Sequence, residues 1–182
     1  VNSINKKIKL KGKVLDLGAG NGYVGLKLLH LFKNKFKLFS SDLEKSSLKT
    51  IKSNALINKK KVVVKSGNLF APWKNYKFDF IVNDVSGISK DVAKISPWFK
   101  NISCESGKDG TKLTIKIIKE SKKFLNKKST LCFPILSFCN EKKILKILNK
   151  EFKFTKKIGQ KEWLLPKEML SKIVLLEKLK KK

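Results

Sequence analysis

Three glycines and a carboxylate stand close together near the N-terminus, in the order of a loop that binds a ligand. Asp16 is followed by Gly18, Gly20 and Gly22. Glycine adopts positive φ angles without steric cost, and its missing Cβ lets a ligand approach the backbone closely. A short apolar run ending at Leu17 precedes the glycines, and a Leu-rich stretch follows them. We therefore expect a buried strand, a tight turn and a helix, with the turn serving as a cofactor loop.

The carboxylate before the glycines helps to distinguish two kinds of cofactor. The dinucleotide fingerprint Gly-x-Gly-x-x-Gly would need its third glycine where Tyr23 stands. A carboxylate at the end of the strand is also a poor neighbour for a pyrophosphate on a helix N-terminus. It suits a cofactor that carries an ammonium and a sulfonium. Another nucleotide site and a structural glycine turn remain the alternatives.

The segment Asp16-Leu17-Gly18-Ala19-Gly20-Asn21-Gly22 resembles motif I of the class I S-adenosylmethionine (SAM) dependent methyltransferases. The resemblance implies an α/β, Rossmann-like sandwich of seven strands, six parallel and one antiparallel. It also implies S-adenosyl-L-methionine as the cofactor, bound by the loop residues Asp16, Gly18, Gly20 and Gly22.

Two further positions are expected to bind the cofactor. Asp42 lies 20 residues after Gly22, at the end of a strand expected over 36–42, where a nucleotide site carries an acid for the ribose hydroxyls. The alternative is an N-cap of the next helix. By its position after the strand expected over 61–66, Asn68 matches the family residue that accepts from the adenine amino group. A turn-forming asparagine is the competing explanation, and the nearby Phe70 and Trp73 either flank the adenine or belong to the core.

A fourth strand, expected over 78–84 beside the first, brings Asn83-Asp84-Val85-Ser86 to the edge of the sheet where ligands bind. Family members that methylate amino and amide groups carry Asn-Pro-Pro-Tyr at this place. The resemblance therefore implies that Asn83 orients the acceptor, although both prolines and the aromatic residue are absent. Asp84 either accepts a proton from a hydroxyl or protonated amine, or caps the following loop.

The second half of the chain gives weaker signals. In the loop over 87–106, Trp98 and Phe99 either clamp a substrate or close an apolar lid. The turn Gly107-Lys108-Asp109-Gly110-Thr111, which precedes a helix pattern, resembles the branch that methylates the glutamine side-chain amide of peptide release factors. A fifth strand over 129–134, a helix over 141–148 and a closing antiparallel pair over 152–155 and 172–176 are expected to follow, with a terminal helix from 168 to 182 as the alternative to the last strand.

Length and composition indicate one compact domain over residues 1–182. The chain is 41% hydrophobic and contains 12 Phe, enough to fill a single core. No apolar run approaches a membrane span, and residues 1–13 lack the apolar centre of a signal peptide, so we expect a cytoplasmic protein. Three cysteines without a Cys-x-x-Cys pair and a single histidine, His30, argue against a metal site.

The net charge of +29 has two interpretations. Clustered cations attract phosphate, so nucleic acid can contact the Lys-rich surface. All 43 basic residues are lysines spread along the chain, however, and this distribution is also that of a coding bias. We therefore expect a SAM-dependent methyltransferase whose acceptor lies on protein, RNA or a small molecule. The alternatives are a catalytically silent SAM-fold module that binds RNA or a partner protein, and a dinucleotide oxidoreductase.

Overall fold

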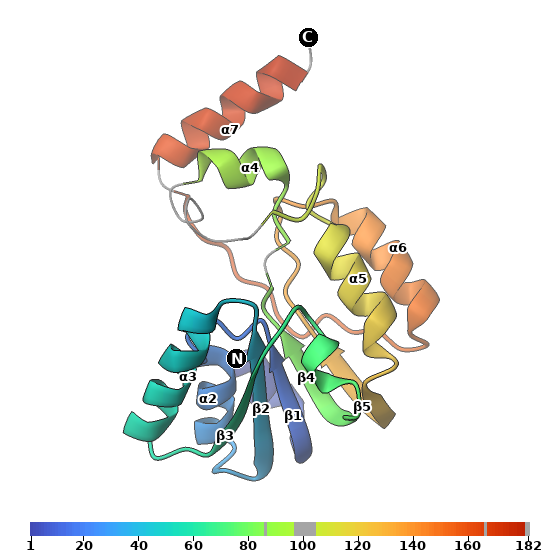
Figure 1. Ribbon diagram of the computed structural model, residues 1–182. Helices are drawn as coiled ribbons and strands as arrows, with labels where there is room; N and C mark the ends of the chain where they lie inside the picture. The colour runs from blue at the N-terminus through green and yellow to red at the C-terminus, as the bar shows by residue number, and fades with distance from the viewer. Residues whose placement is uncertain (86, 97–104, 166, 181–182) are drawn as a thin grey trace. The chain divides into compact units, whose positions relative to one another are not determined.

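The computed structural model describes residues 1–85, 87–96, 105–165 and 167–180. These residues form two compact units. The first comprises Val1–Val85 and Ile117–Pro134, and the second comprises Ser86–Lys116 and Ile135–Lys182. Because their relative placement is not determined, each unit is considered separately (Figure 1).

The first unit contains a sheet of parallel strands in the order β3-β2-β1-β4-β5. The bounds of the strands are β1 (Gly12–Leu17), β2 (Phe36–Asp42), β3 (Val62–Ser66), β4 (Phe78–Asn83) and β5 (Leu125–Cys132). Strands β2 and β4 lie on either side of β1, as expected for the first and fourth strands. The strand order therefore reverses beside β1, and in sheets of this type such a switch point is where ligands bind, outside the carboxyl ends of the strands.

Helices α2 (Tyr23–Leu31) and α3 (Lys45–Ile57) connect the first three strands and lie against the sheet (Figure 1). Parallel strands require such crossover connections. Each helix has an apolar side that is buried, with Leu26, Leu28 and Leu29 on α2 and Ile51 and Ala55 on α3. A short helix that the sequence did not indicate, α1 (Asn2–Lys7), precedes β1.

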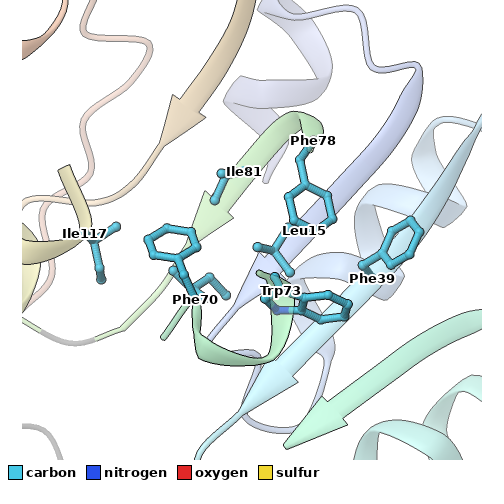
Figure 2. Packing of buried hydrophobic residues seen from close by; sticks show 8 residues of the cluster. Leu15, Phe39, Phe70, Trp73, Phe78, Ile81 and Ile117 are labelled. Carbon is cyan, nitrogen blue, oxygen red and sulfur yellow. The ribbon is translucent and has the colours of Figure 1, made fainter. Parts of the chain in front are cut away.

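The main apolar cluster of the first unit includes residues from β1, β2 and β4 and from η1 (Ala71–Trp73), a 3₁₀ turn after β3 (Figure 2). Side chains alternate between the two faces of a strand, so Leu15 and Leu17 enter this cluster while Asp16 faces the other way. Phe70 and Trp73 are 2% and 0% exposed, and the indole N–H of Trp73 donates to the Ser41 hydroxyl at 2.9 Å. Both aromatic residues thus belong to the core rather than to an adenine pocket.

The second unit consists of helices and loops. It contains α4 (Lys90–Ile95), the first half of α5 (Lys112–Ser121), α6 (Glu141–Glu151) and α7 (Lys167–Lys180). Helix α4, which the sequence did not indicate, packs against α7. No helix in the part of the chain that the structure describes has both the length and the hydrophobicity needed to cross a membrane.

The expected closing antiparallel pair is the main difference between the sequence prediction and the structure. In the described part of the chain the sheet has five strands, all parallel. Residues 172–176 lie in α7, and residues 152–155 are in neither a helix nor a strand. Lys, Glu, Leu and Met favour helix, and Glu168 pairs with Lys172 one turn later at 2.6 Å. The terminal helix, the alternative to the last strand, is therefore correct.

Candidate functional site

The glycine loop joins the end of β1 to the start of α2. Gly18, Gly20 and Gly22 have φ angles of 68°, 54° and 80°, all in the left-handed region. The backbone N–H groups of Gly18 and Ala19 both donate to the Ser41 carbonyl of β2, at 2.9 and 3.0 Å. The loop therefore has the conformation that its glycines predicted, and the end of the neighbouring strand holds it in place.

The three glycines differ in what surrounds them. A Cβ on Gly18 would lie 2.2 Å from Val85 Cγ2, and one on Gly22 would lie 3.3 Å from the Ile51 side chain. A Cβ on Gly20 would meet no atom within 4 Å. Protein packing thus explains the missing side chain at Gly18 and constrains Gly22, whereas Gly20 borders open space that a ligand can occupy.

Asp16 lies beneath the N-terminus of α2. It is fully buried, and its Oδ2 accepts the backbone N–H of Gly25 at 2.8 Å. This N–H belongs to the first turn of α2, where backbone donors have no partner within the helix. A Cβ on Gly25 would lie only 2.8 Å from Asp16 Oδ2, so a glycine is needed for the approach. The second carboxylate oxygen, Oδ1, has no hydrogen-bond partner among the described residues.

Burial raises the pKa of Asp16 to about 7. The hydrogen bond from Gly25 acts in the opposite direction, while the negative charges of Asp84 and Asp42 raise the pKa further. Carboxylates from the ends of three adjacent strands therefore repel one another at this edge of the sheet. A cationic ligand would relieve that repulsion, whereas a pyrophosphate would add to it.

Asp42, at the end of β2, is bonded to the loop. Its Oδ2 accepts the Gly20 N–H at 2.8 Å, and its Oδ1 accepts the Glu44 N–H at 2.9 Å, just before α3. A carboxylate offers about four lone-pair sites, so both oxygens can still accept from hydroxyl groups. The structure thus gives Asp42 a role at the start of α3 and leaves it able to bind ribose.

Asn68 lies in the turn after β3, and its side chain is exposed. Its backbone carbonyl accepts the Ala71 N–H at 3.1 Å, which closes the turn into η1. This contact fits the turn-forming explanation, while the exposed side chain stays accessible to a ligand.

Asn83 and Asp84 lie at the end of β4, where Asn83 is the strand partner of Leu17. Asn83 is 1% exposed, and its Oδ1 accepts the Val85 N–H at 3.1 Å. Asp84 is exposed, yet partial desolvation by the surrounding protein raises its pKa. Trp98 and Phe99, the predicted clamp or lid, lie outside the described residues.

Sequence reasoning missed three residues that shape the site. Gly25 and Ser41 make the contacts described above, and Asn54 of α3 donates from Nδ2 to the Asn21 carbonyl of the loop at 2.8 Å. A glycine inside a helix pattern is a signal that could have identified Gly25. The contacts of Ser41 and Asn54 join distant parts of the chain and leave no local pattern.

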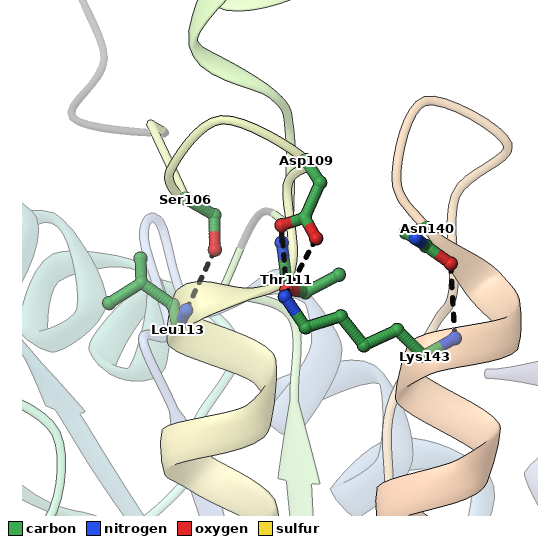
Figure 3. A network of polar contacts seen from close by, with 6 residues as sticks. All are labelled: Ser106, Asp109, Thr111, Leu113, Asn140 and Lys143. Carbon is green, nitrogen blue, oxygen red and sulfur yellow. Dashed lines mark hydrogen bonds and ion pairs between the residues drawn. The ribbon is translucent and has the colours of Figure 1, made fainter.

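The Gly107–Thr111 turn has a structural role in the second unit (Figure 3). Asp109 accepts from the Thr111 hydroxyl at 2.7 Å and from Lys143 Nζ at 2.8 Å. These contacts, led by the one with Lys143, lower the pKa of Asp109 to about 2. No group of three His, Cys, Asp or Glu side chains able to hold a metal ion occurs among the residues placed by the structure.

Comparisons with known proteins agree with this geometry. Residues 1–84 match the model of the methyltransferase small domain family. This stretch contains every candidate residue of the first unit. The chain is 32% identical over 84 residues to the release factor glutamine methyltransferase of Aquifex aeolicus, covering 45% of this chain and 30% of that protein. It is 38% identical over 88 residues to the ribosomal RNA small subunit methyltransferase C of Actinobacillus pleuropneumoniae serotype 7, covering 46% and 25%.

Solved structures share the fold at lower identity. The ribosomal protein L11 methylase of Lactobacillus delbrueckii subsp. bulgaricus superposes with a TM-score of 0.62 at 17% identity, over 82% of this chain and 65% of that one. The 16S rRNA methyltransferase of T. thermophilus, solved with AdoMet and guanosine, gives 0.60 at 15% identity, over 82% and 35%. Of the two curated relatives named above, the chain spans less than a third of the length. The resemblance to class I SAM-dependent methyltransferases is confirmed.

Proposed function

We propose that this chain, a relative of the class I SAM-dependent methyltransferases, binds SAM at the carboxyl ends of β1, β2 and β4 and transfers its methyl group to an acceptor. The proposal is carried by one observation, the open space over Gly20, whose N–H donates to Asp42, at an edge of the sheet where the charges of Asp42 and Asp84 act on Asp16. That space has a bare backbone on one side and negative charge around it. SAM carries an ammonium and a sulfonium, and both suit such a site.

Each part of the cofactor has a proposed partner. The loop residues Asp16, Gly18, Gly20 and Gly22 receive the methionine end. Asp42 accepts from the ribose hydroxyls, and Asn68 accepts from the adenine amino group. The exposed side chain of Asn68 and the free lone pairs of Asp42 support these assignments.

Bound SAM supplies a methyl group on a sulfonium, a good leaving group, so the protein mainly has to orient the acceptor. Orientation can contribute roughly 7–11 kcal/mol to lowering a barrier. Asn83 ends β4, the strand next to β1, and Asp84 follows it directly; we assign both to the acceptor side. There Asp84 accepts the proton that a hydroxyl or protonated amine gives up. The clamp or lid formed by Trp98 and Phe99 stays a prediction.

The acceptor class is a protein side chain, RNA or a small molecule. The relatives named above include one protein methyltransferase and one ribosomal RNA methyltransferase, which supports the first two. Nothing in the comparisons favours a catalytically silent module. The single domain over residues 1–182, the cytoplasmic location and nucleic-acid contact through the lysines stay predictions.

Two measurements test the function. Calorimetry should show that the chain binds SAM and that Asp42→Ala weakens this binding at least about tenfold, since two hydrogen bonds to a charged group are lost. Glu44→Ala, a change at the exposed neighbour of the same turn, should have no effect. Labelled methyl should then pass from SAM to one fraction of a cell extract separated into RNA, protein and small molecules. SAM binding without label in any fraction would favour the silent module.

The role of Asp84 has its own test. Asp84→Asn should lower turnover most on the high-pH side of the profile, where the wild-type carboxylate is ionised. It should weaken SAM binding less than Asp42→Ala does, because Asp84 has no proposed hydrogen bond to the cofactor. Unchanged turnover across the pH range would rule out a base at this position.

A further inference from the structure

Asn83 and Val85 form a small turn immediately after β4. The Asn83 side chain is 1% exposed, and its Oδ1 accepts the backbone N–H of Val85, two residues on, at 3.1 Å. Asparagine often stabilises a turn through this contact with its own backbone. The turn needs a donor at position 85, which a proline would not provide.

The Val85 side chain occupies the place of the missing Gly18 side chain. A Cβ on Gly18 would lie 2.2 Å from Val85 Cγ2 and 3.5 Å from Val85 Cβ. The valine is β-branched and therefore rigid at χ1. Since Gly18 also donates to the Ser41 carbonyl at 2.9 Å, the first residue of the loop is held between the end of β2 and Val85.

The strand register brings these features together. Leu17, directly before Gly18, is the partner of Asn83 across β1 and β4. The two segments that leave these strands therefore start side by side. A change in the Asn83 turn moves Val85, and Val85 bears directly on Gly18.

We propose that Asn83 is a positioning residue of the cofactor loop, acting through the Val85 N–H and the Val85 side chain. This inference uses SAM as a probe and so rests in part on the proposed function, but the turn can be measured without SAM. It follows that a substitution on the acceptor side of the site, at Asn83, changes the binding of the cofactor on the other side. Asp84, between the two turn residues, is then the group left to face the acceptor.

The experiment compares four variants by calorimetry with SAM. Asn83→Ala and Val85→Ala should each weaken SAM binding about five- to tenfold, the range expected for loss of one hydrogen bond or its packing partner. Asn83→Ser keeps an oxygen acceptor without adding a buried charge and, since a serine hydroxyl supports such a turn more weakly, should recover part of the affinity lost in Asn83→Ala. The double variant, with alanine at both positions, should bind SAM no more weakly than the weaker of the two single variants. Both changes act through the same contact between Val85 and Gly18. If Asn83 contacted only the acceptor, Asn83→Ala would change turnover and leave the affinity for SAM unaltered.

Amide hydrogen exchange at Val85 provides the second readout. The Val85 N–H should exchange slowly in the wild type, at an intermediate rate in Asn83→Ser, and quickly in Asn83→Ala. If the wild type fails to bind SAM, the proposed function fails, while the exchange rates still decide whether the turn exists. Unchanged SAM affinity in Asn83→Ala would overturn the inference. So would a Val85 exchange rate that does not depend on residue 83.

Discussion

Gly18 and Gly20 have similar backbone conformations but different surroundings, and this difference predicts different effects of an added methyl group. Gly20→Ala should cost about 1–2 kcal/mol of stability through its positive φ. It should weaken SAM binding at least about tenfold, because the new Cβ enters the space assigned to the cofactor. Gly18→Ala should cost about 1–3 kcal/mol more stability, since its Cβ collides with Val85. Urea unfolding and calorimetry separate the two effects.

A second substitution serves as the control for the collision. In a Val85→Ala background, Gly18→Ala should lose less stability than in the wild type, because the atom it meets at 2.2 Å is gone. The stability cost of Gly20→Ala should not depend on residue 85. If Gly20→Ala bound SAM as tightly as the wild type, the open space beside Gly20 would not be the cofactor site.

Asp16 predicts a pH dependence of stability. Burial raises its pKa in the folded state to about 7, against an ordinary value of 3.8. The folded state therefore holds a proton that the unfolded chain has released. The resulting stabilisation is fully present below pH 3.8 and is lost as the pH rises toward 7. Between pH 5 and pH 8, the wild type should lose on the order of 2–3 kcal/mol relative to Asp16→Asn.

Urea midpoints of both proteins at the two pH values measure this difference. Groups that titrate in both proteins cancel in the comparison. Parallel pH profiles would show that Asp16 is ionised in the folded state throughout this range.

For single residues, the sequence predicted local structure where one short segment carries the whole pattern. The conformation of the glycine loop is confirmed, and Asp42 ends a strand as expected, while its contact with ribose stays a prediction. Asn54 and Ser41 act across the fold, and their partners become visible only when the strands are in register. The Asn83 oxygen was expected to face the acceptor, but a turn too short to have a sequence signature engages it.

Helix α2 contains a glycine, Gly25, whose replacement tests how closely the helix must approach Asp16. A Gly→Ala change inside a helix usually gains about 1 kcal/mol. Gly25→Ala should instead destabilise the protein by about 1–3 kcal/mol, because the Cβ would lie 2.8 Å from Asp16 Oδ2 and 2.9 Å from Leu38 Cδ1. Thermal unfolding measures the change. In an Asp16→Ala background the loss should shrink, and an equal loss there would mean that Asp16 does not limit the approach of α2.

The elements that the sequence predicted well are those with a strong apolar period and clear ends. Strand β2 was expected at its observed bounds, β3 and β4 were placed to within one residue, and β1 ends at Leu17 as expected. The short helices α1 and α4 have six residues each, too few to show a helical period. Residues 172–176 are apolar enough for a strand, and the ion pair that favours α7 begins outside that window, at Glu168.

For the whole molecule, chain connectivity supports the proposal of a single domain. The first unit is made of two segments, Val1–Val85 and Ile117–Pro134, and the second unit is inserted between and after them. Helix α5 contributes residues to both units, and β5 joins the sheet only after the chain has passed through the second unit. A boundary that divides a helix is an unusual place for two independent domains to separate.

The net charge of +29 leads to a prediction about where RNA binds. Lysines are spread over the helices of both units, so we expect attraction to RNA to be electrostatic and not confined to one element. Two matched triple Lys→Glu variants test this, one on α3 (Lys45, Lys49 and Lys52) and one on α6 (Lys142, Lys146 and Lys150), all exposed positions. Each set lowers the charge equally. Both should weaken binding of a single-stranded RNA oligomer to a similar degree.

Salt dependence provides the physical check on that expectation. Binding through phosphate contacts weakens steeply as salt rises, and each lost contact reduces the slope. The two triple variants should therefore show the same reduced slope in a plot of log affinity against log salt concentration. If the α3 set removed binding and the α6 set left it intact, the lysines of the first unit would form a specific RNA-binding surface. An RNA acceptor would then be favoured over a protein or a small molecule. A coding bias affects every surface position and would not confine RNA binding to one unit.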